Sequence, residues 1–136
     1  MSVFVDTSVW SLALRRDVSS VASEVRALTQ MIESGESILT TGLVLQELLQ
    51  GFSGAKARAQ ILDRFSALPL LLPDREDHIA AAELRNRCRR SGKQIGTIDA
   101  LLAHLCIRHG LTMLSTDQDF DHIARQCALK LWRASV

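Results

Sequence analysis

Short runs of apolar residues alternate along the chain with longer stretches in which apolar residues recur every three or four positions. The short runs are typical of buried strands, and the helically spaced stretches are typical of amphipathic helices. We predict strands at residues 3–5, 37–40, 70–72, 111–115 and 129–132. We predict helices at residues 8–15, 18–34, 43–52, 55–68, 74–91, 97–109 and 119–126.

This alternation of strands and helices predicts an α/β fold with a mostly parallel central sheet. Strands that are buried on both faces read as continuous apolar runs, so we expect flanking helices on both faces and a three-layer sandwich. Right-handed connections would bring the carboxyl ends of all strands to one edge, where ligands bind in such sheets. A chain of 136 residues has the length of one domain, which we expect to span residues 1–136.

Four acidic residues lie at or soon after the predicted carboxyl ends of strands, and a fifth, Asp99, would join them if its helix begins beside the same edge of the sheet. Asp6 directly follows the first strand, and Glu47 lies in the helix after the second strand. Asp99 lies in the first turn of a later helix, and Asp117 and Asp119 follow the fourth strand. We therefore expect these residues, although distant in the sequence, to converge at one edge of the sheet.

Converging carboxylates repel one another, and some must take up protons unless a cation neutralises them. The hard cations Mg²⁺ and Mn²⁺ prefer oxygen ligands of this kind. Such a site suits hydrolysis of a phosphodiester, because the metal can deprotonate a water and neutralise charge that develops on the phosphate. The acidic set therefore predicts a metal-dependent hydrolase.

Each of the five acidic residues also has a purely structural explanation. Asp6 could cap a helix, Glu47 could be a solvated helix residue, and Asp99 could stabilise a helix N-terminus. Asp117 and Asp119 could belong to a turn. The functional interpretation depends on the whole set and its placement.

Composition narrows the functional classes only slightly. Hydrophobic residues make up 47% and aromatic residues 4%, which excludes a disordered chain and disfavours base stacking as the main mode of binding. The formal net charge is +1, so any nucleic-acid contact must rely on local charge. Three cysteines without a metal-site spacing, together with the lack of a leader or a long apolar stretch, predict a cytoplasmic protein with no membrane segment.

Four segments resemble the motifs of the PIN-domain family and, within it, the VapC-type toxins. They are VFVDTSVW at residues 3–10, LQEL at 45–48, GTIDALLA at 96–103 and LSTDQDF at 114–120. Each segment alone is weak evidence for the family, but the four occur in the expected order over nearly the whole chain. The resemblance implies a PIN-like sandwich and a Mg²⁺- or Mn²⁺-dependent endoribonuclease, the toxin of a toxin–antitoxin pair.

The resemblance also implies roles for individual residues and partners. Asp6, Glu47, Asp99 and Asp117 would form the catalytic set, and Asp119 would join Asp6, Asp99 and Asp117 around the metal. The hydroxyl of Thr116 would orient a carboxylate or a water. The implied partners are an RNA substrate, a cognate antitoxin and a second copy of the chain in a homodimer.

Basic residues cluster shortly before Asp99, at Arg85, Arg87, Arg89, Arg90 and Lys93. They could hold RNA phosphates, but most of them fit the solvated face of a long helix equally well. Arg85 and Lys93 are the candidates for RNA contact. An apolar stripe through Val21, Val25, Leu28 and Ile32 predicts core packing, with an antitoxin or dimer surface as the alternative.

Other functional classes fit the sequence less well. A haloacid-dehalogenase-type phosphatase would need a second aspartate two residues after Asp6, where Ser8 stands. A two-component receiver domain would need paired acidic residues after the first strand and a further aspartate after the third strand. A PIN-like module that only binds RNA or protein remains an alternative, and metal-dependent RNA cleavage would distinguish it from the enzyme.

Overall fold

The computed structural model describes residues 1–15 and 22–134, and these form a five-stranded sheet in the order β3-β2-β1-β4-β5. The strands are β1 (Ser2–Val5), β2 (Ser37–Thr41), β3 (Leu70–Leu71), β4 (Thr112–Leu114) and β5 (Lys130–Leu131). Every neighbouring pair of strands is parallel. The predicted α/β fold with a parallel central sheet is therefore confirmed.

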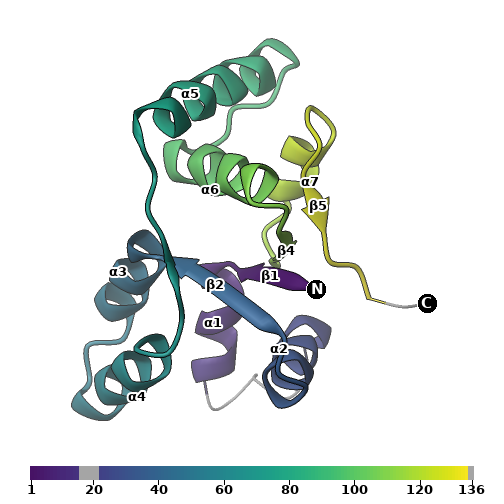
Figure 1. Cartoon of the computed structure of the whole chain (residues 1–136). Coiled ribbons are helices and arrows are strands. Elements are labelled where there is room, and N and C mark those ends of the chain that lie inside the picture. Colours follow the sequence, from purple (N-terminus) through teal and green to yellow (C-terminus); the bar gives the residue numbers. More distant parts are fainter. Residues whose placement is uncertain (16–21, 135–136) are drawn as a thin grey trace.

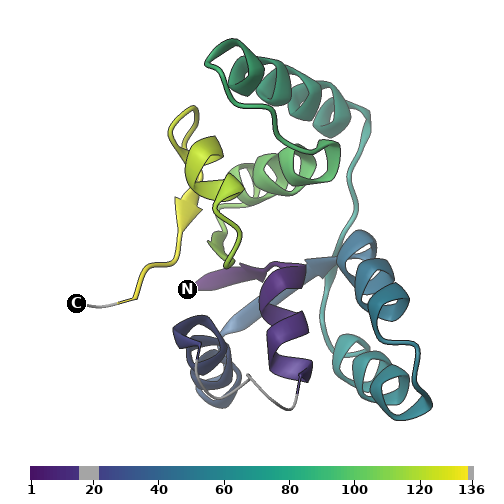
Figure 2. The ribbon, with the colours of Figure 1, turned by 180° about the vertical axis from the view of Figure 1, so that it is seen from behind.

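Helices cover both faces of this sheet. The helices of the described residues are α1 (Thr7–Leu14), α2 (Ser23–Glu33), α3 (Gly42–Gly51), α4 (Ala55–Phe65), α5 (Arg75–Arg90), α6 (Thr97–Arg108) and α7 (Asp119–Ala124). Helices α1 to α4 lie on one side of the sheet, and α5 to α7 lie on the other (Figure 1, and from behind in Figure 2). None of these helices is long and apolar enough to span a bilayer.

The order of the strands creates a switch point between β1 and β4. From β1 the chain moves outward through β2 to β3, and it then returns to the other side of β1 to form β4 and β5. Because right-handed connections in opposite directions lie on opposite faces, the two groups of helices separate at this point. The crevice beyond the carboxyl ends of β1 and β4 is therefore the expected place for a ligand.

Some element boundaries differ from the predicted ones. The third strand ends at Leu71, because Leu72 is 80% exposed and Pro73 has no N–H to continue a ladder. The helix that we predicted from residue 18 begins in the described chain at Ser23, and residues 18–21 of that prediction, which include Val21 of the apolar stripe, lie outside the described residues. In the stripe that we predicted as core, Val25 and Leu28 are indeed buried, at 8% and 2% exposure.

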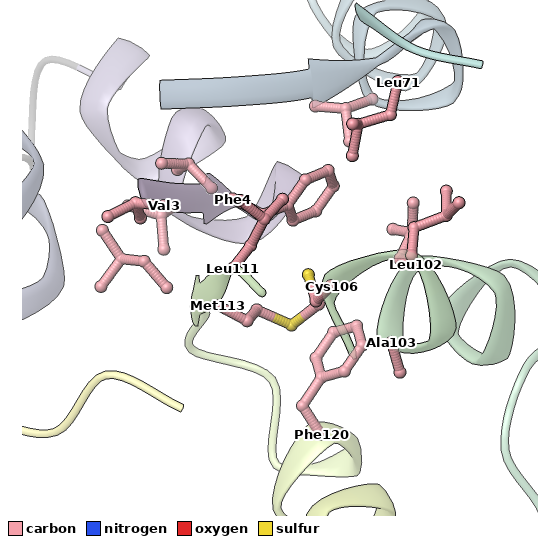
Figure 3. Packing of buried hydrophobic residues seen from close by; sticks show 14 of the residues in the cluster. Val3, Phe4, Leu71, Leu102, Ala103, Cys106, Leu111, Met113 and Phe120 are labelled. Atoms are coloured by element: carbon pink, nitrogen blue, oxygen red, sulfur yellow. The ribbon is translucent and has the colours of Figure 1, made fainter. Parts of the chain in front are cut away.

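The core joins the helices α6 and α7 to the centre of the sheet. Phe4 of β1, Met113 of β4, Cys106 of α6 and Phe120 of α7 are at most 1% exposed. Figure 3 shows their side chains gathered in one cluster between the sheet and these helices. Burying a Phe or Met side chain stabilises a protein by about 1.5–3 kcal/mol, so this cluster holds both helices firmly on the sheet.

A polar cluster ties α5 to α6. Asp77, which is 1% exposed, forms a capping box with Asp74, in which each backbone N–H donates to the other carboxylate at 2.9 Å. Its carboxylate also contacts two residues of α6, namely His104 Nε2 at 2.9 Å and Arg108 Nη1 at 2.6 Å. The pKa of Asp77 is lowered to about 2, mainly by the hydrogen bond from the backbone N–H of Asp74. His104 and Arg108 lower it further. The cluster thereby fixes α6, whose first turn carries Asp99.

Candidate active site

Asp6 stands at the switch point of the sheet. It directly follows β1, and its backbone N–H donates to Leu114 O at 2.9 Å, the last residue of the adjacent strand β4. The side chain is buried, with 7% exposure. Although Asp6 occupies the position before α1, its carboxylate accepts no N–H from that helix. The alternative role as a helix cap is therefore not the one its side chain performs.

Two serine hydroxyls hold the Asp6 carboxylate instead. Ser8 Oγ donates to Asp6 Oδ2 at 2.8 Å, and Ser115 Oγ donates to the same oxygen at 2.9 Å. The serines are themselves held by backbone groups, since Thr116 N–H donates to Ser8 Oγ at 3.1 Å and Asp117 N–H donates to Ser115 Oγ at 3.0 Å. This network links the chain after β1 to the chain after β4 and leaves Asp6 Oδ1 for another partner.

Three further carboxylates gather beside this network. Asp99, Asp117 and Asp119 can each present one oxygen within 4.8 Å of the others. Asp99 comes from the first turn of α6, and Asp119 is the first residue of α7. Asp117 Oδ1 accepts the backbone N–H of Asp119 at 2.9 Å, so these two residues form one structural unit. The structure thus brings together three of the predicted site residues from two separate segments.

Negative charge is concentrated enough at this site to change a pKa. The pKa of Asp99 is raised to about 6, first by desolvation and then by Asp117, Asp6, Asp119 and Glu47. The N-terminus of α6 would favour the charged form by only about 0.3–1 kcal/mol, which is too little to offset these effects. Clustered carboxylate oxygens are the donors that Mg²⁺ or Mn²⁺ prefers, so the residues present fit such an ion.

Glu47 lies at the margin of the site. It is exposed on α3, and its Oε1 accepts a hydrogen bond from Thr7 Oγ1 at 2.8 Å. Among the charged groups that raise the pKa of Asp99, its contribution is the smallest. Glu47 therefore approaches the site but does not join the compact cluster of Asp99, Asp117 and Asp119.

The two basic candidates occupy different positions. Lys93 Nζ lies 3.7 Å from Asp119 Oδ1, so this residue reaches the acidic cluster. Arg85 Nε donates to Ile95 O at 2.9 Å and thereby holds the loop that leads into α6. Arg87 has a structural contact as well, since its Nη1 donates to Gln126 O at 3.0 Å.

The two serines that hold Asp6 were not among the residues predicted from the sequence. The predicted orienting hydroxyl was that of Thr116, whereas the hydroxyls that bind Asp6 belong to Ser8 and Ser115, and Thr116 contributes its backbone N–H. Their positions shortly after β1 and after β4 could have suggested a contact between them. That suggestion needs the order of the strands, in which β1 and β4 are neighbours.

Comparisons with known proteins agree with this architecture. The family model described as the PIN domain matches residues 3–126. Ribonuclease VapC11 of Mycobacterium tuberculosis is 34% identical over 125 residues, which cover 90% of this chain and 92% of that protein.

Two solved structures are similar in fold. VapBC2 from Rickettsia felis, bound to a DNA fragment from its promoter, matches with a TM-score of 0.73 and 20% identity, over 99% of this chain and 100% of that one. VapC20 from Mycobacterium tuberculosis, described as a toxin that cleaves the sarcin-ricin loop, matches with a TM-score of 0.65 and 20% identity, over 88% of this chain and 92% of that one.

Proposed function

The chain belongs to the PIN-domain family and is a homologue of VapC ribonucleases, and from this premise we propose that it is a divalent-metal-dependent endoribonuclease, the toxin of a toxin–antitoxin pair. The observation that carries the proposal is the cluster of Asp99, Asp117 and Asp119 beside the buried Asp6. An acidic cluster at the switch point of a parallel sheet suits a metal that acts on a phosphodiester.

We assign the metal to Asp6, Asp99, Asp117 and Asp119, with Glu47 completing the catalytic set at its margin. A bound Mg²⁺ or Mn²⁺ supplies activation of a water and neutralisation of charge on the phosphate. Ser8 and Ser115 orient the Asp6 carboxylate by binding its Oδ2, and its Oδ1 is the oxygen that would bind the metal. Thr116 helps to position Ser8 through its backbone, and Arg85 and Lys93 are our candidates for RNA contact.

The test is cleavage of RNA by the purified protein, separated from any antitoxin. We expect cleavage of a pool that contains ribosomal, transfer and messenger RNA with Mg²⁺ or Mn²⁺, and none with EDTA. A DNA pool and a small aryl phosphate serve as further substrates. Turnover of the aryl phosphate without RNA cleavage would favour a phosphatase. Binding of RNA without cleavage would favour the binding-only module and would contradict the proposal.

Removal of the serine hydroxyls that bind the Asp6 carboxylate should lower activity without unfolding the protein. We expect Ser115→Ala to reduce kcat/KM for RNA cleavage about 10- to 100-fold, the usual effect of losing a group that orients a metal-binding residue. Ser8→Ala should act in the same direction, because its hydroxyl contacts the same oxygen. The matched control is Ser53→Ala, in the exposed segment between α3 and α4. Wild-type activity in both site variants would show that the serines do not position Asp6.

We also propose a cognate antitoxin and a homodimer as partners. The similar solved structure, VapBC2, is a toxin–antitoxin complex, which supports the antitoxin, whereas the homodimer rests on the resemblance to the family. A hollow of about 620 Å³ between α1, α2 and α4 has both apolar and charged walls, which suits an amphipathic partner segment; its lining includes Leu28, Ile61, Phe65, Lys56, Asp63 and Arg64. Light scattering of the purified chain should give the mass of a dimer, and a monomer at micromolar concentration would contradict the homodimer.

A further inference from the structure

The backbone around Lys93 is held on both sides. Gly92, with a φ of +99°, ends α5 in the left-handed conformation, and Lys93 N–H then donates back to Cys88 O at 3.0 Å. Two residues further on, Ile95 O accepts from Arg85 Nε at 2.9 Å. Because these bonds fix the main chain, any change in the position of the Lys93 ammonium must come from rotations of its side chain.

The side chain of Lys93 is placed near the acidic cluster but is not locked to it. Its ammonium lies 3.7 Å from Asp119 Oδ1, which is beyond a direct hydrogen bond, and the two side chains are 44% and 36% exposed. Solvent-exposed pairs of this kind are weak, and the long lysine stem carries three donors that can be redirected. The pair can therefore be exchanged at little cost in free energy.

Asp119 also belongs to the cluster with Asp99 and Asp117, whose oxygens would hold a divalent ion. An ammonium and a divalent cation repel each other when they neutralise the same carboxylate. We propose that Lys93 is an exchangeable counter-ion of the site: its ammonium pairs with Asp119 in the metal-free protein and moves to a phosphate oxygen of the RNA once metal is bound. This inference rests on the proposed function, since it needs both the metal and the RNA.

Two consequences of opposite sign follow. In the absence of RNA, Lys93 competes with the metal for Asp119 and so weakens metal binding. In the metal-loaded protein, the released ammonium strengthens RNA binding through one phosphate contact. A lysine that merely stabilised the loop would produce neither effect, and a lysine that always faced the RNA would strengthen RNA binding in both states.

The first experiment is titration of the RNA-free protein with Mn²⁺ by calorimetry. We expect Lys93→Met to bind Mn²⁺ about twofold to fivefold more tightly than the wild type, the size of effect of an exposed ion pair. Lys130→Met is the matched control, because Lys130 pairs in register with Thr112, at the other end of β4 from the site. In an Asp119→Asn background, Lys93→Met should have no effect on Mn²⁺ affinity. Equal affinities of Lys93→Met and wild type would overturn the inference.

The second experiment measures binding of a short fluorescein-labelled RNA of mixed sequence, in EDTA and in Ca²⁺. We expect Lys93→Met to weaken binding about twofold to fivefold in Ca²⁺, with the slope of log affinity against log salt reduced by about one. In EDTA it should match the wild type, and Lys93→Arg should restore affinity in Ca²⁺. An equal loss in both conditions would overturn the exchange. A wild type that binds no Mn²⁺ would instead refute the proposed metal-dependent function itself.

Discussion

The variant Asp99→Asn is expected to lose RNA cleavage and, in the metal-free state, to melt at a higher temperature than the wild type. Cleavage should fall by at least about 1000-fold, because a carboxylate that we assign to the metal is removed from a site where the ion supplies most of the electrostatic stabilisation. The fold should survive, since Asp99 caps no helix: Gly96 holds the cap position of α6.

The rise in stability follows from the sign of the pKa shift. The pKa of Asp99 is about 6 in the folded protein and 3.8 in the reference state, so folding disfavours its charged form. The resulting destabilisation is absent below pH 4 and complete above pH 6. Because Asp99 is partly exposed, we discount the full shift to about 1–2 kcal/mol, which corresponds to about 3–6 °C in Tm.

Thermal melts in EDTA across this pH range, together with RNA cleavage in Mg²⁺, test this prediction. Asp99→Asn should melt above the wild type at neutral pH, and the difference should vanish as the pH falls below 4. Glu83→Gln, which removes a carboxylate from the exposed surface of α5, should behave as the wild type in both assays. Retained cleavage in Asp99→Asn would exclude the residue from the site, and an unfolded variant would give it a structural role instead.

The variant Asp77→Ala should be among the most destabilising single changes in the protein, with a loss of about 3–5 kcal/mol. It removes a buried carboxylate that closes the capping box of α5 and contacts His104 and Arg108 of α6. His104 would then lose its acceptor, and Arg108 of α6 would keep only its longer contact with Asp74 Oδ2, at 3.4 Å. Because folding lowers the pKa of Asp77 to about 2, its contribution is present above pH 4 and is lost as the pH falls towards 2.

Urea unfolding at neutral pH measures this loss of stability directly. The matched control is Glu76→Ala, which removes an exposed acidic residue from the same first turn of α5 and should change stability by no more than about 0.5 kcal/mol. Asp77→Asn should lie between the two, because the amide oxygen can still accept one of the bonds. A loss below about 1 kcal/mol in Asp77→Ala would mean that the cluster contributes little to stability.

Elements with a clear apolar pattern could be predicted from the sequence. The first and last residues of elements that depend on long-range contacts could not. Strand β1 was found because both of its faces are buried and Val3, Phe4 and Val5 form a continuous apolar run. Strand β3 was predicted too long, since Leu72 is apolar but 80% exposed, and the apolar pattern does not distinguish it from Leu71. The helix that contains Asp77 was placed correctly. The contacts of Asp77 with α6 could not be predicted, because apolar periodicity does not report contacts between polar side chains of two helices.

The same division holds for the candidate site. The places of the carboxylates could be read from the sequence, because apolar periodicity locates Asp6 and Asp117 after strands and Asp99 in the first turn of a helix. Which of their atoms meet follows from the tertiary structure alone. Ser115 contacts Asp6 from 109 positions away, and Lys93 reaches Asp119 from the end of another helix. Such contacts depend on the strand order and register, which result from packing of the whole chain, and this is why the chemistry was visible in the sequence while its geometry was not.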